Sequence, residues 1–153
     1  MGRYRDFRQV TEEAFRYAAA SFDLAPGDET VRSVVDAYLR LAAFAEVPGV
    51  MEALAAEGRT LAVLSNGTHE MLETALRHAG LARYLTAILS VDEVGIYKPH
   101  PRVYALVPER LAGRVGNSRR PGASPKVLIL DNTGLSSRLG QRGLLPHTVA
   151  IAS

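Results

Sequence analysis

The stretch Leu61-Ala62-Val63-Leu64-Ser65-Asn66-Gly67-Thr68 decides the fold, because a continuous apolar run passes directly into a polar turn. Such a run, without polar alternation, is typical of a strand that is buried on both faces. The apolar residues that follow, from Met71 to Ala79, recur with helical spacing. This pattern stops at Gly80, and glycine commonly closes a helix at this position. The stretch therefore predicts a strand, a turn and a helix in succession.

The same unit recurs toward the carboxyl end of the chain. Apolar runs at 87–90, 127–130 and 148–152 predict three further strands. A helix is expected from Pro101, since proline's missing N–H costs nothing in the first turn of a helix. Pro108 lies inside this helix, where it costs about 3 kcal/mol or forces a break. Buried strands alternating with helices predict the α/β class: a parallel, Rossmann-like sheet with helices on both faces.

The residues before Pro48 have a different pattern and predict a small helical subdomain. Helices are expected at about 11–22 and 31–42, separated by Pro26-Gly27-Asp28, and these two helices should pack as an antiparallel pair. We therefore expect a helical cap over residues 1–46 and an α/β core over residues 47–153. The core should open with a short helix at about 50–57.

The composition excludes several classes of protein. The chain has 153 residues, no cysteine, four scattered histidines and a net charge of +2, which argue against metal binding and against nucleic acid as a partner. No apolar stretch is long enough to cross a membrane, so a cytoplasmic protein is expected. Residues 113–126 are rich in Gly, Pro, Ser and Arg and are expected to be mobile. The chain uses sixteen arginines but only two lysines, so Lys98 and Lys126 are distinctive.

Polar residues follow the predicted strands, at the edge of a parallel sheet where ligands usually bind. Ser65, Lys98, Asp131 and Asn132 all fall at this edge. Ser65 is also a candidate N-cap of the helix that follows. Lys98 has the strongest case for a functional role, since a compact ammonium group suits holding one carboxylate oxygen.

Three stretches together resemble the type II haloacid dehalogenases, the (S)-2-haloacid dehalogenases of the haloacid dehalogenase (HAD-like) hydrolase superfamily. The resemblance covers residues 2–111 and is carried by Gly2-Arg3-Tyr4-Arg5-Asp6-Phe7, by Leu61 to Gly67, and by Leu89-Ser90-Val91-Asp92 running on to Tyr97-Lys98-Pro99-His100-Pro101-Arg102-Val103-Tyr104. It implies a hydrolase without a cofactor or metal. An aspartate displaces halide from C2 of a short 2-haloalkanoic acid, and water then hydrolyses the ester to a 2-hydroxy acid.

The resemblance also implies roles for single residues. Ser65 would hold the substrate carboxylate, Asn66 would donate its amide N–H to the leaving halide, and Lys98 would hold a carboxylate oxygen. Tyr104 would support the lysine, although an aromatic residue on a helix face is more often part of the core. Phe7 would line the pocket wall, with ordinary packing as its alternative. Asn132 is the matching residue of the family's last motif and a candidate for substrate binding.

The chain also departs from the family pattern. The family's nucleophilic aspartate lies in an Asp-x-x-Gly-Thr motif on a first, central strand, and no Asp here follows a buried strand with that motif. We therefore expect no turnover by this chain, and a Lys98 ammonium that faces Asp131, solvent or a small anion. The loss of a central strand would leave two strand edges open, which favours homodimerisation, as does the habit of the family.

Two other functions stay open. A magnesium-dependent phosphatase of the same superfamily is favoured by Asp131 and disfavoured by Leu135, which stands in place of a second acid. A non-catalytic module that binds a small anion and dimerises through its helix pair is the alternative outside enzymes. In every case the expected ligand is a small 2-haloacid or another small anion.

Overall fold

A four-stranded parallel sheet forms the centre of the molecule, with the strand order β2-β1-β3-β4. The structure is a computed structural model and describes residues 3–112, 127–131 and 147–150. The strands are β1 (Thr60–Ser65), β2 (Ala87–Ser90), β3 (Val127–Asp131) and β4 (His147–Ala150). Ala62 of β1 pairs with Ala87 of β2 and with Ile129 of β3. The predicted strands and their parallel arrangement are confirmed.

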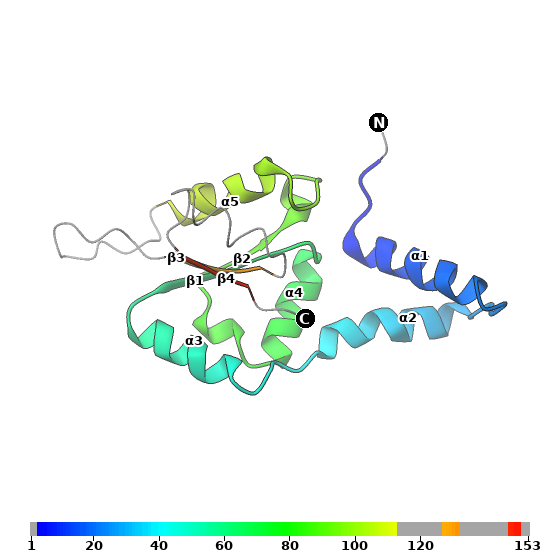
Figure 1. The fold of residues 1–153 in the computed structure, drawn as a ribbon, viewed down its shortest axis with the longest axis horizontal. Helices are drawn as coiled ribbons and strands as arrows, with labels where there is room; N and C mark the ends of the chain where they lie inside the picture. Colours follow the sequence, from blue (N-terminus) through cyan, green and yellow to red (C-terminus); the bar gives the residue numbers. More distant parts are fainter. Residues whose placement is uncertain (1–2, 113–126, 132–146, 151–153) are drawn as a thin grey trace.

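Helices cover both faces of this sheet, as the alternation in the sequence predicts. Helices α3 (Val47–Ala56) and α4 (His69–His78) lie on one face, and α5 (Pro101–Leu111) lies on the other (Figure 1). Alternate side chains of β1 point to opposite faces of the sheet and pack against different helices. Ala62 and Leu64 are buried against α5, whereas Leu61 is buried against α3. The continuous apolar run is therefore explained by burial of both faces of one strand.

The ends of the helices that flank β1 follow local sequence signals. Thr68 caps α4, since its Oγ1 accepts a hydrogen bond of 3.2 Å from the N–H of Met71. Gly80 follows the last turn of the same helix with a φ of 70°, a conformation that glycine adopts without strain. Gly58 follows α3 in the same way, with a φ of 73°. The stop predicted at Gly80 is confirmed, and Gly58 ends α3 by the same local signal.

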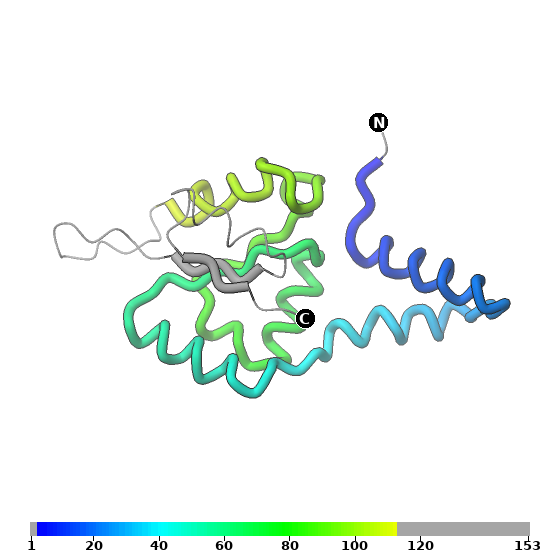
Figure 2. Tube along the Cα trace, viewed as in Figure 1, coloured from blue at the N-terminus to red at the C-terminus, as the bar shows by residue number. Residues whose placement is uncertain are grey.

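Helices α1 (Phe7–Ala20) and α2 (Asp28–Ala37) form a hairpin that projects from the sheet layers, and its closed end points away from them (Figure 2). A short 3₁₀ helix, η1 (Tyr38–Arg40), continues α2 and contacts α4. The pair begins earlier than predicted. Asp6 caps α1 by accepting a bond of 2.8 Å from Gln9 N, which fixes the first turn at Phe7.

Three expectations need correction. The helix predicted from about residue 50 already begins at Val47, because Pro48 is compatible with a first turn. Helix α5 does not break at Pro108 but continues to Leu111. Pro108 is exposed, while Val107 and Leu111 beside it are buried against the sheet, so packing holds the last turn in place.

The third correction concerns the strand edges. Two edges were expected to lie open in the middle of the sheet, but β1 pairs with β2 on one side and with β3 on the other. This pairing satisfies the backbone groups that the open edges would expose. The argument for dimerisation from open central edges is therefore wrong for these strands. No helix in the described ranges is long and apolar enough to span a membrane.

Candidate functional site

Three predicted site residues meet at the carboxyl end of β1. Ser65 is the last residue of that strand, Asn66 follows it, and Lys98 reaches the same place from the loop before α5. The Nζ atom of Lys98 donates a hydrogen bond of 3.2 Å to the carbonyl oxygen of Leu64. Lys98 and Ser65 therefore lie at the same end of the sheet.

The Ser65 hydroxyl belongs to a tight turn. Its Oγ accepts a hydrogen bond of 3.1 Å from the N–H of Gly67. Thr68 provides the cap of α4, so the reading of Ser65 as an N-cap is wrong. A hydroxyl that accepts from Gly67 keeps its own hydrogen for donation, which is the capacity that binding a carboxylate requires.

The side chain of Asn66 joins the two loops of the site. Its Oδ1 atom accepts a hydrogen bond of 3.1 Å from the backbone N–H of Lys98. This bond uses the carbonyl side of the carboxamide and turns its NH₂ group, with two donors, away from Lys98 N. The arrangement suits an acceptor ligand on the NH₂ side of Asn66.

Lys98 is buried, with 7% of its surface exposed, which is rare for a lysine. Its ammonium group has three donors, and one of them is directed to Leu64 O. A buried cation is costly unless its donors are satisfied, so this carbonyl stabilises the lysine. The sequence led us to expect Asp131, solvent or an anion beside Lys98, and the carbonyl of Leu64 is a partner that this reasoning missed.

Two further predicted residues lie near the ends of helices. Phe7 begins α1, is half-buried, and packs edge-to-face on Tyr38 with ring centroids 5.8 Å apart. Tyr104 is half-buried on α5, and its ring packs against the core cluster around Leu64 and Val103. The packing reading holds for both rings, and their roles in a pocket stay predictions. Asn132 lies outside the described residues, as does the segment 113–126 that we expect to be mobile.

Sequence reasoning assigned no role to Ser90, although it lies in one of the quoted stretches. Ser90 is fully buried, and its hydroxyl donates a bond of 2.7 Å to Gly67 O. The Ser90 hydroxyl oxygen also accepts a bond of 3.1 Å from Asp92 N. Ser90 thus ties the turn at Ser65 to the loop after β2. The sequence signal that could have identified Ser90 is a serine at the end of an apolar strand.

His100 has a structural role at the start of α5. Its Nδ1 atom accepts a bond of 3.2 Å from Arg102 N and caps α5. Within the described ranges, no group of three His, Asp or Glu side chains is arranged to hold a metal ion. The phosphatase alternative depends on the side chain of Asp131, so it stays a prediction.

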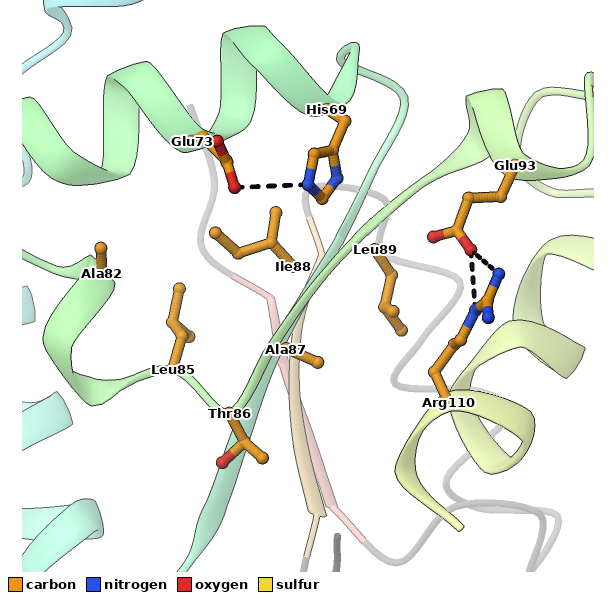
Figure 3. A pocket seen from close by; sticks show the side chains of 10 residues that line it. All are labelled: His69, Glu73, Ala82, Leu85, Thr86, Ala87, Ile88, Leu89, Glu93 and Arg110. Carbon is orange, nitrogen blue, oxygen red and sulfur yellow. Dashed lines mark hydrogen bonds and ion pairs between the residues drawn. The ribbon is translucent and has the colours of Figure 1, made fainter.

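A separate hollow of about 350 Å³ lies along β2 (Figure 3). His69 Nε2 lies 3.4 Å from Glu73 Oε1 on one side, and Glu93 binds Arg110 on the other. Each basic group there already faces a carboxylate. This hollow therefore suits an anion less well than the Lys98 site does.

Comparisons with known proteins agree with this architecture. Residues 1–119 match the model of the haloacid dehalogenase-like hydrolase family. The chain is 47% identical over 111 residues to (S)-2-haloacid dehalogenase 1 of Pseudomonas sp. strain CBS-3, covering 72% of this chain and 49% of that protein. It is 42% identical over 111 residues to the (S)-2-haloacid dehalogenase of Pseudomonas sp. strain YL, covering 72% and 48%. The chain thus spans about half the length of these relatives.

Solved structures show the same likeness. The L-2-haloacid dehalogenase of Xanthobacter autotrophicus, solved with chloropropionic acid covalently bound, superposes with a TM-score of 0.75 at 33% identity. The match covers 94% of this chain and 54% of that one. The predicted resemblance is confirmed, and the chain belongs to the haloacid dehalogenase-like hydrolase family.

Proposed function

We propose that this chain provides the substrate-binding part of a hydrolase that releases halide from short (S)-2-haloalkanoic acids. In this proposal, residues 1–46 form the helical cap and residues 47–153 belong to the α/β core. One observation carries it: the buried Lys98 lies with Ser65 and Asn66 at the carboxyl end of β1. The similarity to (S)-2-haloacid dehalogenases supports the choice of substrate class.

The donors of the site suit the two ends of a 2-haloacid. The Ser65 hydroxyl, which accepts from Gly67, would donate to the substrate carboxylate. The Asn66 NH₂ group, turned away from Lys98 N, would face the halogen. The Lys98 ammonium would hold carboxylate oxygen, and a charged donor in a buried place binds an anion more strongly than a neutral one.

The reaction itself needs a carboxylate that attacks C2 and water that hydrolyses the ester, and no cofactor takes part. The Asp-x-x-Gly-Thr motif of the family's nucleophile does not occur in this sequence. We therefore expect the 153-residue chain to bind 2-haloacids without releasing halide. Saturable halide release from 2-chloropropionate by the pure chain, abolished by Lys98→Ala, would mean that another carboxylate attacks C2.

Binding is tested by calorimetric titration of the pure chain with (S)-2-chloropropionate, (R)-2-chloropropionate and propionate. The (S) acid should bind most tightly. Lys98→Met should weaken its binding about tenfold or more, since a hydrogen bond to a charged group contributes about 1.5–3 kcal/mol. The matched control is Arg77→Met, which removes an arginine side chain that is 73% exposed on α4.

The outcomes separate the candidates. If the Lys98→Met and Arg77→Met variants bind (S)-2-chloropropionate with equal affinity, the assignment of Lys98 to the binding site is contradicted. Inorganic phosphate that binds only with Mg²⁺, and not at all after Asp131→Asn, would favour the phosphatase alternative over the dehalogenase.

We also propose that two copies of the chain associate through the α1–α2 hairpin. A groove of about 500 Å³ at its closed end is lined almost wholly by apolar residues, among them Phe15, Phe22 and Leu24. Phe22 is 77% exposed and Leu24 is 63% exposed, and burial of such side chains in a dimer would be favourable. Sedimentation should find a dimer that Phe22→Glu dissociates and Arg32→Glu leaves intact. A monomer at every concentration would contradict this proposal.

A further inference from the structure

The segment before α1 is fastened to the loop that follows β2. The Tyr4 hydroxyl donates a hydrogen bond of 2.5 Å to Asp92 Oδ1. The Tyr97 hydroxyl donates a bond of 2.9 Å to the carbonyl oxygen of Arg5. The rings of Tyr4 and Tyr97 lie 5.5 Å apart, and Tyr4 packs over Gly95, where an added Cβ would lie 3.8 Å from its Cγ. We call these contacts of Tyr4, Arg5, Asp92, Gly95 and Tyr97 the tyrosine latch.

The latch continues by hydrogen bonds into the Ser65 turn. Asp92 N donates to the buried Ser90 hydroxyl, which in turn donates to Gly67 O. Gly67 N donates to Ser65 Oγ. The phenol of Tyr4 is therefore connected to the hydroxyl of Ser65 by four hydrogen bonds, which are linked through the covalent structure of Asp92 and of Gly67. Both polar groups of the Gly67 backbone are held by these bonds.

A second branch reaches the lysine. Tyr97 directly precedes Lys98, whose N–H donates to Asn66 Oδ1. The Tyr97 side chain holds Arg5 of the segment before α1, and its backbone continues into Lys98. The two loops that carry the candidate anion donors are therefore both joined to the base of the helical hairpin.

The Tyr4 phenol is the hydrogen-bond donor of the latch. Burial, followed by the hydrogen bond to Asp92, raises the pKa of Tyr4, so its phenol stays protonated well above neutral pH. Burial also raises the pKa of Tyr97. A phenol that donates to a carboxylate makes one of the stronger side-chain hydrogen bonds.

We propose that Tyr4 and Asp92 are positioning residues of the anion site: their bond sets the Ser65 and Lys98 loops relative to the helical hairpin, without touching substrate. This inference rests on the proposed function of that site. Tyr4 and Asp92 are 88 positions apart in the sequence. Asp92 reaches the Ser65 turn through Ser90 and Gly67. Tyr4, Asp92 and Ser90 lie in stretches that carry the resemblance, but neither the resemblance nor the proposed function assigns a role to any of them.

The test compares four variants of the full chain. Tyr4→Phe removes the phenol hydroxyl and Asp92→Ala removes its acceptor, while the N–H of residue 92 still reaches Ser90. Asp92→Asn keeps an oxygen that can accept from Tyr4. Tyr17→Phe is the matched control, since Tyr17 is 82% exposed on α1. Circular dichroism establishes that each variant is folded.

Two readouts are measured: the amide ¹H–¹⁵N resonances of Gly67 and Lys98, and the Kd for (S)-2-chloropropionate. Tyr4→Phe and Asp92→Ala should shift both resonances and weaken binding about fivefold, within the usual range for residues that act through others. Asp92→Asn should retain the wild-type Kd to within about twofold, as a conservative replacement of the acceptor. Tyr17→Phe should change neither readout.

The two proposals fail in different ways. If Lys98→Met binds 2-chloropropionate as the wild type does, the proposed function fails, whatever the latch does to the resonances. If Tyr4→Phe leaves the Gly67 and Lys98 amides in place, the latch is not coupled to the site. If the amides shift while the Kd stays unchanged, the positioning role is overturned.

Discussion

Replacing Ser90 by alanine tests the bond network that shapes the candidate site. The Ser90 hydroxyl is fully buried, donates to Gly67 O at 2.7 Å and accepts from Asp92 N at 3.1 Å. Ser90→Ala removes the hydroxyl, and with it both hydrogen bonds, without adding any atom to the site. We therefore expect the cost to come from two backbone groups that lose their hydrogen bonds.

The expected magnitude follows from how far each group is buried. Gly67 is buried, so its carbonyl loses a donor that water cannot easily replace, which costs about 1–3 kcal/mol. Asp92 is only half-buried, and water can replace part of the bond to its N–H, so this loss is about 0.5–1 kcal/mol. Together they should lower the free energy of unfolding by about 1.5–4 kcal/mol and the Tm by about 3–16 °C.

Denaturant unfolding followed by circular dichroism measures this difference. Ser21→Ala is the matched control, because the Ser21 hydroxyl also donates to a backbone carbonyl, Ala18 O at 2.6 Å, but is exposed. Its loss should change the free energy of unfolding by about 0.5 kcal/mol or less. If Ser90→Ala were as mild as Ser21→Ala, the buried network would not hold the Ser65 turn, and the reasoning would be refuted.

Three further changes test other parts of the fold. Thr68→Ala removes the cap of α4 and should lower the free energy of unfolding by about 1 kcal/mol in denaturant titration; no change would contradict the capping role. Gly67→Ala places a Cβ 3.3 Å from Leu72 Cδ2 and should weaken 2-chloropropionate binding by disturbing the turn, whereas unchanged calorimetric affinity would show that the turn adapts. The pKa of Tyr4 is raised by burial and by Asp92, so its contribution to stability is present below its ordinary pKa near 10 and is lost as the pH rises through the higher folded value. Wild type should therefore lose more stability than Tyr4→Phe between about pH 9 and pH 11, and parallel unfolding curves would contradict this.

The strands were predicted well because their signal is local. Residues 61–64 and 87–90 are short apolar runs between glycine-rich or polar turns, and β1 and β2 match them to within a residue at each end. Burial of both faces leaves few other structures open to such runs. The glycine stops at Gly58 and Gly80 are local signals of the same kind.

The helix ends were predicted less well, because packing outweighs local preference there. Pro108 disfavours a helix by about 3 kcal/mol, yet the burial of neighbouring apolar side chains such as Leu111 on α5 compensates for it. The start of α1 depends on the Asp6 cap, a signal present in the sequence that the apolar spacing alone did not reveal.

Some residues of the candidate site can be predicted from local sequence patterns, whereas others depend on contacts between distant parts of the chain. Ser65, Asn66 and Lys98 follow predicted strands or precede a predicted helix, so their meeting could be inferred from the topology of a parallel sheet. The bond between Tyr4 and Asp92 spans 88 positions, and no periodic pattern encodes such a contact. Sequence reasoning therefore finds the groups that face a ligand more readily than the groups that hold them.

This division bears on what the chain can do. The candidate anion donors lie between residues 65 and 98, and the same stretch supplies the Ser90 and Asp92 bonds that order them. Attack on C2 requires a further group, a bare carboxylate aimed at the substrate. Ser65, Asn66 and Lys98 make hydrogen bonds to other described residues, and these bonds do not involve that carboxylate. Anion binding and halide release should therefore be separable: the chain should discriminate between enantiomers of 2-chloropropionate in a binding experiment in which neither is consumed.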